Sequence, residues 1–497
     1  MDTNDLSPAE LRVWHAFPKG AAVDFRTTED EDAADGADWG PERTVRAEVL
    51  RALLLNGPLE DGEIAALRLS GARISGALDL SYGVVDHALR LSDCHFEQAP
   101  VLYAARLRTL KLDGSVLPGL AAATVQVEGM VYLSGCRFHG LVRLGGARID
   151  GALFLDGCRI TPDPEDTEKW PALRLGHATI GDNLWAPGLR VDGEVRLSGA
   201  SVAGAVTLDH ARLSHPGDVA LDAQTLTVGT DVHMRYAHVE GWIGLRGARV
   251  PGRLDLSYAE LSHTGDMALR ASSAVIGELW LRKSPPMEGA LNLRRAQIDV
   301  LFLEPDVLPD EVLLNGLVYT TLTPHEPAQR RLPMLDRDGD GYLTHGYEQL
   351  TAAYLRTGDD EAARVVQLAK LRRHRRTLPW PGRLWGHLQE VTVGYGFRPL
   401  LACVWLLSLL AVGSVVYGLH HPRPLKADEA PDFHPVFFTL DLLLPVISFG
   451  QEGAFAPEGW YQTLSYAFVV AGWILATTVF AGVTRSISRG AGPGGNP

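Results

Sequence analysis

Hydrophobic and polar positions alternate with a period of two through residues 62–303, and the alternation restarts every 11 residues. Each cycle has the form Gly-x-aliphatic-x-aliphatic-x-x-Ala-x-aliphatic-x, and clear copies begin at Gly140, Gly151, Gly193 and Gly241. Alternation of this kind predicts short strands, with glycine or alanine where the chain turns tightly. The pattern therefore predicts many short strands joined by tight turns.

A longer repeat of 48 residues overlies the short cycle. The segment LSHPGDVALDAQTLTVG from Leu213 aligns with LSHTGDMALRASSAVIG from Leu261. Short strands without intervening helices cannot bury one unit alone, so the units must stack as a solenoid. With two cycles per coil, roughly 24 residues, we expect about ten coils and a rod of roughly 50 Å. The pattern resembles the right-handed β-helices of pentapeptide-repeat proteins and bactofilins, without a strict five-residue beat.

The long repeat also duplicates a polar motif, His215 with Asp218 and His263 with Asp266. Stacked histidines and carboxylates would suit a ligand groove or a metal. Asp in a His-x-Gly-Asp turn also bonds its own backbone, and we favour this second interpretation, a long corner of the coil.

Residues 1–61 are expected to form a helical cap on the solenoid. Ser7, Pro8 and Glu10 make a capping box with proline at the first helical position. Aliphatic residues from 45 to 54 follow helical spacing. Such a cap would cover the exposed edge of the first coil.

Residues 304–345 are expected to form a linker that contains half of an EF-hand loop. Carboxylates occupy positions 1, 3 and 5, and Gly341 occupies position 6. The twelfth position is Tyr347, and a glutamate follows one residue late. We favour an acidic turn that leads into the following helix, and a calcium site is the alternative. Its candidate residues are Asp336, Asp338, Asp340, Tyr342 and Glu348.

Residues 346–376 are expected to form a helical hairpin that resembles a single tetratricopeptide-like unit. Its second helix ends in a basic cluster, Arg372, Arg373, Arg375 and Arg376. Such a cluster favours the anionic headgroups of membrane lipids. Residues 377–399, which contain Trp380 and Trp385, are expected to lie at the membrane interface.

Residues 400–497 are expected to form a two-span transmembrane hairpin. Residues 400–419 and 462–484 are uncharged apolar runs, each long enough to cross a bilayer. Basic residues precede the first run and follow the second, whereas the loop 420–461 holds only Arg423 and Lys426. The positive-inside rule therefore predicts a multi-pass protein of the plasma membrane, with an external loop and with both termini and the β-helix in the cytoplasm.

The external loop contains a segment, 433–456, at the position of a channel's pore loop. An apolar stretch too short to cross is followed there by Ser448, Phe449, Gly450 and Gln451. The layout resembles a degenerate two-span ion-channel module, which would need four subunits. An interfacial helix is the simpler interpretation. The potassium-filter string at 392–396 precedes the first run, which is the wrong place for a filter.

Composition limits the remaining classes of function. A formal charge of -14 argues against general nucleic-acid binding. Cys94, Cys136 and Cys158 fall at the small position of the cycle, where thiols usually serve as core filling. The sequence contains no nucleotide-binding, zinc-protease, nucleophile-elbow or haem motif, so we identify no catalytic residue and no cofactor other than calcium.

The segments WGPERTVRAEVLRALLL, LRLSGARISGALDLS, YEQLTAAYLRTGDDEAARVVQLAKLRR and LDLLLPVISFGQ resemble a family of actinobacterial membrane proteins, over nearly the whole chain. Members are often named membrane-associated oxidoreductases, so the resemblance implies a redox role, for which we find no motif. We expect a membrane-tethered scaffold or sensor that binds a protein partner or its own copies at the inner face of the membrane; the channel and the oxidoreductase are the alternatives.

Overall fold

The computed structural model describes residues 5–28, 31–167, 170–377, 379–380, 399–426, 431–444 and 447–490, with the backbone alone for 264–266, 399–402 and 477–490. The chain divides into two compact units, Met1–Asp359 and Asp360–Pro497. Each unit is described by itself below.

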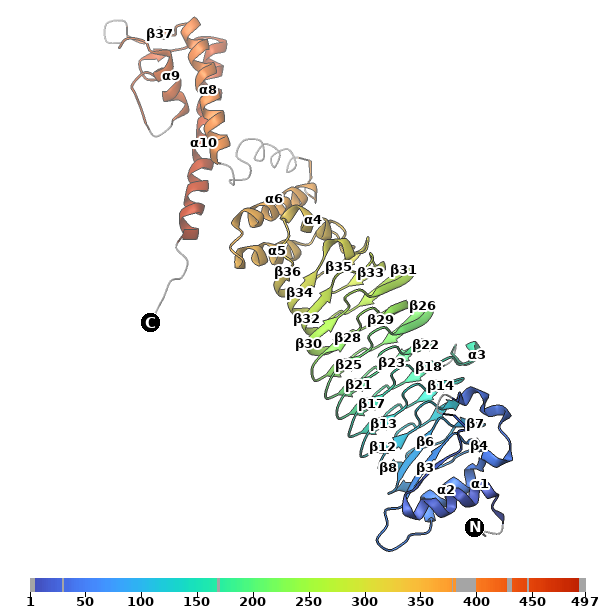
Figure 1. Ribbon diagram of the computed structural model, residues 1–497. Coiled ribbons are helices and arrows are strands. Elements are labelled where there is room, and N and C mark those ends of the chain that lie inside the picture. Colours follow the sequence, from blue (N-terminus) through green and yellow to red (C-terminus); the bar gives the residue numbers. More distant parts are fainter. Residues whose placement is uncertain are drawn as a thin grey trace, which may run out of the picture. The chain divides into compact units, whose positions relative to one another are not determined.

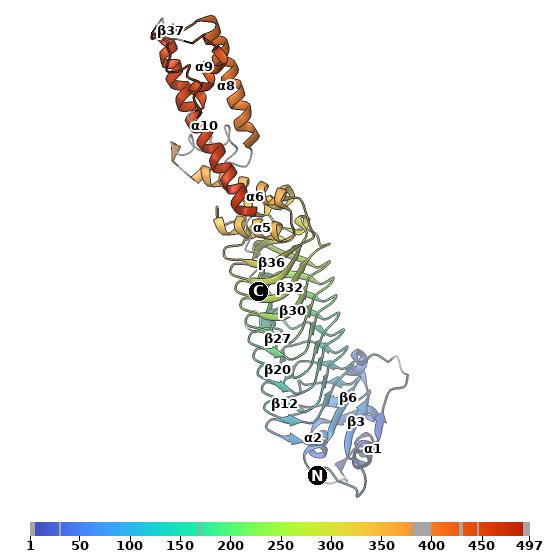
Figure 2. The same cartoon turned by 90° about the vertical axis from the view of Figure 1, so that its left-hand side faces the viewer.

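Unit 1 is built on a parallel β-solenoid of about 12 turns (Figures 1 and 2). One sheet contains β1 (Ala22–Asp24), β3 (Ala66–Ser70), β5 (Val84–Val85), β6 (Ala88–Ser92), β8 (Arg106–Leu107), β9 (Leu110–Lys111), β12 (Gln126–Val127), β13 (Val131–Tyr132), β16 (Arg148–Ile149), β17 (Leu153–Phe154), β20 (Thr179–Ile180), β21 (Leu184–Trp185), β24 (Ser201–Val202), β25 (Val206–Thr207), β27 (Thr227–Val228), β28 (Val232–His233), β30 (Arg249–Asp255), β32 (Val275–Leu281), β34 (Gln297–Leu303) and β36 (Val318–Thr323). The second sheet contains β2 (Thr44–Arg46), β4 (Arg73–Ser75), β7 (His95–Phe96), β10 (Val116–Leu117), β11 (Leu120–Ala121), β14 (Arg137–Phe138), β15 (Val142–Arg143), β18 (Arg159–Ile160), β19 (Leu173–Arg174), β22 (Arg190–Asp192), β23 (Val195–Arg196), β26 (Arg212–Asp222), β29 (His238–Gly244), β31 (Glu260–Arg270), β33 (Glu288–Asn292) and β35 (Val312–Leu313). The β-helix prediction is confirmed.

A regular coil has two short strands in each sheet, and successive coils differ in length. Gln126 pairs with Arg148, and Thr179 pairs with Ser201, which sets the length of the regular coil. The step from Ser201 to its partner Thr227 is longer, because the corner after Ser214 takes extra residues. The long repeat is therefore one regular coil followed by one lengthened coil, rather than the two equal coils that the sequence predicted.

The interior of the solenoid is filled by ladders of aliphatic side chains. Each inward-facing position repeats in register from coil to coil, as in one column of buried residues: Val127, Ile149, Ile180, Val202, Val228, Val250, Ile276 and Ile298. One coil carries an excursion with the short helix α3 (Pro164–Thr167). The hydrophobic effect acting on these ladders explains why alternation alone predicts the fold.

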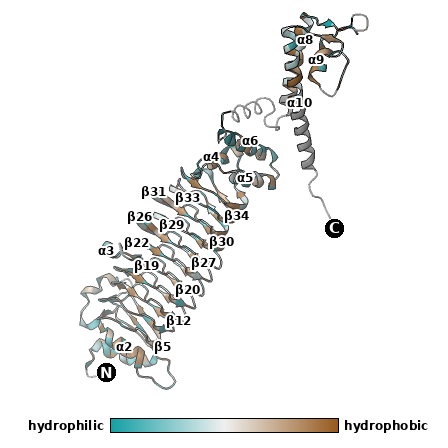
Figure 3. Ribbon diagram, turned by 180° about the vertical axis from the view of Figure 1, so that it is seen from behind, coloured by the Kyte–Doolittle hydropathy of each residue, from teal (hydrophilic) through white to brown (hydrophobic). Residues whose placement is uncertain are grey.

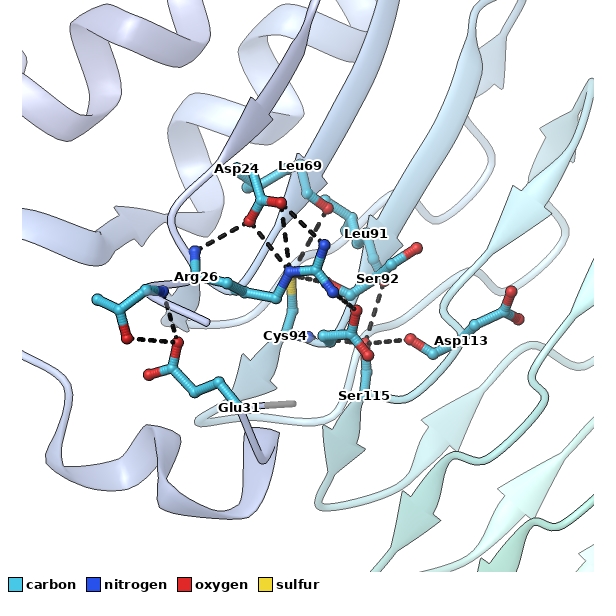
Figure 4. A network of polar contacts seen from close by, with 12 residues as sticks. Asp24, Arg26, Glu31, Leu69, Leu91, Ser92, Cys94, Asp113 and Ser115 are labelled. Atoms are coloured by element: carbon cyan, nitrogen blue, oxygen red, sulfur yellow. Dashed lines mark hydrogen bonds and ion pairs between the residues drawn. The ribbon is translucent and has the colours of Figure 1, made fainter. Parts of the chain in front are cut away.

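The N-terminal segment both caps the solenoid and joins it. Helices α1 (Pro8–Ala16) and α2 (Ala47–Asn56) alternate with 3-10 turns η2 (Phe17–Lys19), η3 (Ala33–Asp38) and η4 (Pro41–Arg43). Strands β1 and β2 pair with β3 and β4, so residues 22–46 supply a first coil that the sequence did not predict. Figure 4 shows Arg26 bonded to Asp24; the same guanidinium reaches Asp93 at 3.0 Å.

The solenoid also extends past its predicted end at residue 303. The 3-10 turn η5 (Pro305–Val307) leads into β35 and β36, which add pairs through Thr323. The helices α4 (Ala328–Asp336) and α5 (Thr344–Arg356), rather than a linker, follow β36. The buried Arg331 of α4 donates to the carbonyl oxygens of Leu303 and Pro324, the latter at 2.7 Å. These contacts fasten the helices over the last coil and cover its edge.

Unit 2 contains α6 (Asp360–Thr377), α8 (Pro399–Leu419), α9 (Pro435–Leu443) and α10 (Trp460–Gly490), with a small antiparallel pair, β37 (Arg423–Pro424) and β38 (Phe455–Ala456). Helices α5 and α6 occupy the two halves of the predicted hairpin 346–376. Over the described residues, no helix combines the length and the apolar character needed to cross a membrane. The transmembrane prediction therefore stays a prediction.

Candidate functional site in unit 2

Helix α9 packs against both long helices of unit 2, and two glycines make the close approach possible. A Cβ on Gly413 of α8 would lie 2.3 Å from a methyl group of Thr439. A Cβ on Gly472 of α10 would lie 2.2 Å from the carbonyl oxygen of Leu443. Both distances are too short for any real side chain. Glycine at these two positions therefore allows α9 to lie directly against both long helices.

The loop after α9 is organised by the buried carboxylate of Asp441, which is 5% exposed. One oxygen accepts a hydrogen bond from the backbone N–H of Phe449. The other accepts from the backbone N–H groups of Gln451 at 2.7 Å and of Glu452 at 3.2 Å. Bonds from backbone amides to an ionised carboxylate are the strong kind and hold a loop in one conformation.

Gln451 extends this polar network to the entrance of α9. Its side-chain oxygen accepts from the backbone N–H of His434 at 3.1 Å, and its amide nitrogen donates to the carbonyl oxygen of Asp432, also at 3.1 Å. Gln451 is itself buried, whereas Ser448, Phe449 and Gly450 are exposed. The pore-loop candidates are therefore a closed turn held from inside by Asp441 and Gln451.

Asp441 was not among the residues predicted from the sequence, although its isolation among apolar residues marks it. Between residues 433 and 451 it is the one carboxylate in an otherwise apolar stretch. An isolated carboxylate in such a setting is usually functional or structurally essential, because an unpaired buried charge costs several kcal/mol.

The outer surfaces of α8 and α10 are largely apolar where side chains are described. Large aliphatic and aromatic side chains of α8 and α10 are more than half exposed: Val404, Leu407, Val412, Val415, Tyr466, Val470 and Trp473. Figure 3 shows α8 largely in the colour of apolar residues. Exposed apolar side chains in this number mark a contact surface.

The predicted calcium residues lie at the end of unit 1 and are engaged in other contacts. Asp336 ends α4 and Glu348 lies in α5. Asp340 forms a two-pronged ion pair with Arg294, which lowers the pKa of Asp340, whereas burial raises the pKa of Asp338. Over the described residues, no three His, Cys, Asp or Glu side chains gather as metal ligands. Calcium binding by Asp336, Asp338, Asp340, Tyr342 and Glu348 stays a prediction.

The predicted basic cluster lies in the last turns of α6. Arg372 and Arg376 are exposed there, and Arg373 and Arg375 are half-buried. Residues 381–398, most of the predicted interfacial segment together with the string at 392–396, lie outside the described residues. The corner at His215 forms as expected, with the Asp218 carboxylate accepting from the backbone N–H of Val219 at 2.7 Å.

The three solenoid cysteines are core residues. Cys94, Cys136 and Cys158 are fully buried and donate to backbone carbonyl oxygens of Ser92, Leu112 and Leu133. Burial raises the pKa of Cys94 and of Cys158 to about 12. A buried thiol that stays protonated at neutral pH is a poor nucleophile, so these cysteines fit a role in filling the core.

Comparison with family models, with curated proteins and with solved structures found no match for this chain.

Proposed function

We propose that the protein is a membrane-tethered scaffold or sensor, whose unit 2 anchors it in the bilayer and whose solenoid binds a partner protein or its own copies. The observation that carries the proposal is the apolar outer surface of α8 and α10, where Leu407 and Val412 are more than half exposed, around a bundle that buries Asp441. Side chains are described over only 403–419 and 460–476 of the two uncharged runs. The runs themselves continue in the sequence to spanning length.

Charge placement supports a cytoplasmic solenoid at the inner face of the plasma membrane. The arginine cluster of α6 precedes the first run, and Arg485 and Arg489 follow the second. The positive-inside rule retains such residues in the cytoplasm, and anionic lipid headgroups attract the α6 cluster. The intervening loop, with Arg423 and Lys426, would then be external.

Alkaline extraction of membranes tests the anchor. We expect the full chain to remain in the membrane pellet after a carbonate wash. Replacing Leu407 and Val412 by arginine should release it, because each arginine within a span costs about 3 kcal/mol. The matched control carries Val275→Arg and Val318→Arg, two exposed positions of the solenoid (44% each), and should stay in the pellet. Full extraction of the unaltered chain would contradict the proposal.

A second candidate function is an ion-conducting module. The specific observation that favours it is α9 packed against α8 and α10 and followed by a turn held by Asp441, the order of a pore helix and its loop. It requires a tetramer, and Gly450→Ala should then change ion flux in reconstituted vesicles. A monomeric or dimeric mass in detergent, or unchanged flux, would remove this candidate.

The oxidoreductase alternative rests on the family resemblance alone. It requires a bound chromophore or a reductase activity with added flavin or nicotinamide. Purified protein that absorbs only as its aromatic side chains do, and that reduces nothing with either cofactor, would remove it.

A further inference from the structure

One corner of the solenoid carries a column of residues in the left-handed backbone conformation, which we call the corner column. Its members occupy the same place in successive coils, with φ between 57° and 67°: Gly135, Gly157, Gly188, His210, Tyr236 and Tyr258. The last three rings stack in parallel. The centroid of His210 lies 5.0 Å from that of Tyr236, which lies 4.6 Å from that of Tyr258.

The ring stack stops at His210 because the next three positions are glycines. A Cβ on Gly157 would meet nothing within 4 Å, and one on Gly188 would meet only the backbone nitrogen of Gly157, at 4.0 Å. The space above the His210 ring, where one more ring would continue the stack, is therefore open. The glycines are not required by the backbone, since His210, Tyr236 and Tyr258 adopt the same conformation.

A row of arginines runs beside the corner column, two residues further along each coil. Arg137, Arg159, Arg190 and Arg212 pair in register in β14, β18, β22 and β26, one strand spacing apart, about 4.8 Å. Arg137 is paired with Asp32 at 2.6 Å. The other three are exposed and form no ion pair with any carboxylate that the structure describes. Three like charges this close repel one another unless an anion lies between them.

The column and the row line two adjoining hollows. One, of about 370 Å³, is lined only by Gly135, Gly157 and Gly188 and by Arg137, Arg159 and Arg190. The other, of about 690 Å³, continues it along Arg212 towards Tyr236 and Tyr258 and includes the carboxylates of Asp192, Glu240 and Glu260. These volumes suit a small ligand.

The glycine hollow has no carboxylate in its lining, whereas the larger hollow has three. Glu240 accepts from the hydroxyl of Ser214 at 2.8 Å, and Glu260 contacts the imidazole of His238 at 2.8 Å. Asp192 is the acidic group nearest in sequence to the arginine row, two residues after Arg190. The glycine end is therefore cationic and open, and the far end is acidic and occupied by its own contacts.

We propose that this groove binds a nucleoside phosphate, with the base stacked on His210 over Gly188 and the phosphates held by Arg159, Arg190 and Arg212. Column and row lie two residues apart along the chain, at most about 7 Å, a span that a ribose can bridge. Guanidinium groups bind phosphate oxygens in two-pronged pairs, and a base stacks on any aromatic face. The proposal is independent of the membrane anchor.

Calorimetric titration of the full chain in detergent tests the proposal, with ADP as the probe and with pyrophosphate and adenosine as its two halves. We expect ADP to bind more tightly than either half. Arg190→Glu should lower the affinity for both ADP and pyrophosphate at least tenfold. If that variant misfolds, Arg159→Glu takes its place, with the same expected loss. Asp192→Asn should tighten ADP severalfold. Arg249→Glu, an exposed arginine of the other sheet, is the matched control and should bind as the unaltered chain does.

Gly188→Tyr separates the two parts of the site. The tyrosine would continue the existing stack and fill the place of the base, in a conformation that Tyr236 and Tyr258 already adopt. We expect at least tenfold weaker ADP binding with pyrophosphate affinity within twofold, and no effect of Gly247→Thr at another corner. The proposal would be overturned if ADP did not bind, or if Arg190→Glu and Arg249→Glu weakened ADP binding equally. It would also be overturned if Gly188→Tyr still bound ADP, or if the chain bound an oligothymidylate but not ADP.

Discussion

The solenoid and the bundle of α8, α9 and α10 both have an apolar core, yet their described outer surfaces differ. The solenoid buries aliphatic ladders and carries charges on its outer faces, often as cross-strand ion pairs such as Arg253 with Glu278. The bundle buries Asp441 with three backbone donors and exposes Leu407 and Trp473. The two regions therefore differ in what they expose rather than in what they bury, and exposed apolar side chains in such number mark a contact surface.

The largest effect should come from removing the charge inside the bundle. Asp441→Ala leaves three backbone N–H groups without an acceptor, which we expect to cost about 4 kcal/mol of folding free energy. Thermal unfolding in detergent, monitored by Trp fluorescence, measures the loss. Glu452→Ala, an exposed carboxylate in the same turn, is the control. Equal melting temperatures for the two variants would show that the carboxylate does not organise the turn.

Truncating leucine in each region should give opposite outcomes. Leu301 is completely buried between Leu279 and Leu322 of neighbouring coils, so Leu301→Ala should cost about 3 kcal/mol. Leu407 is 62% exposed, so Leu407→Ala should change stability by less than about 0.5 kcal/mol in detergent. Denaturant titration of both variants checks the contrast, and a reversed order would contradict the packing described for the two regions.

A pH effect on stability should come from Glu10 in the N-terminal cap. Burial would raise the pKa of Glu10, but bonds from Arg46 and from the backbone of Ser7 lower it to about 2. Because the folded pKa lies below the unfolded value, the stabilisation is present above pH ~4.5 and is lost as pH falls towards ~2; it amounts to about 3 kcal/mol. Unfolding of Glu10→Gln should lose this acid dependence, whereas exposed Glu48→Gln should retain it. Parallel curves for both variants would argue against a role for Glu10.

The smallest effect should come from calcium. Ion pairing with Arg294 occupies Asp340, so calcium must displace a guanidinium, and we expect ~1 mM calcium to add less than about 1 kcal/mol. Arg294→Gln should enlarge the shift in melting temperature, and Asp338→Ala should abolish it. A shift of the same size in Asp338→Ala would place the ion elsewhere.

Sequence periodicity predicted the solenoid because every coil repeats the same inward-facing positions. It missed the first coil, since β1 and β2 are separated by 3-10 turns and lack the glycine beat. It also missed the last coil of the solenoid, which ends at Thr323, because the 3-10 turn η5 interrupts that coil as well. The 48-residue repeat was divided into two equal coils, because the sequence alone does not show that the extra residues after Ser214 lengthen only one of them. The strand register shows this.

The candidate sites were less accessible to sequence reasoning. Asp441 stood out only as a charge among apolar residues, and its three donors lie beyond the end of its own helix. The arginine row is visible as Arg before an aliphatic or aromatic residue in several cycles. Only the stacking register shows that Arg159, Arg190 and Arg212 are neighbours without carboxylates between them.

Chemical labelling of intact cells tests the central claim of a membrane-anchored, cytoplasmic solenoid most directly. In a Cys403→Ser background, Arg423→Cys and Leu355→Cys would be exposed separately to a membrane-impermeant maleimide; both positions are exposed, and the other cysteines are buried. We predict labelling of Arg423→Cys in intact cells and of Leu355→Cys only after lysis. Labelling of Leu355→Cys in intact cells, or of neither variant before lysis, would contradict the account.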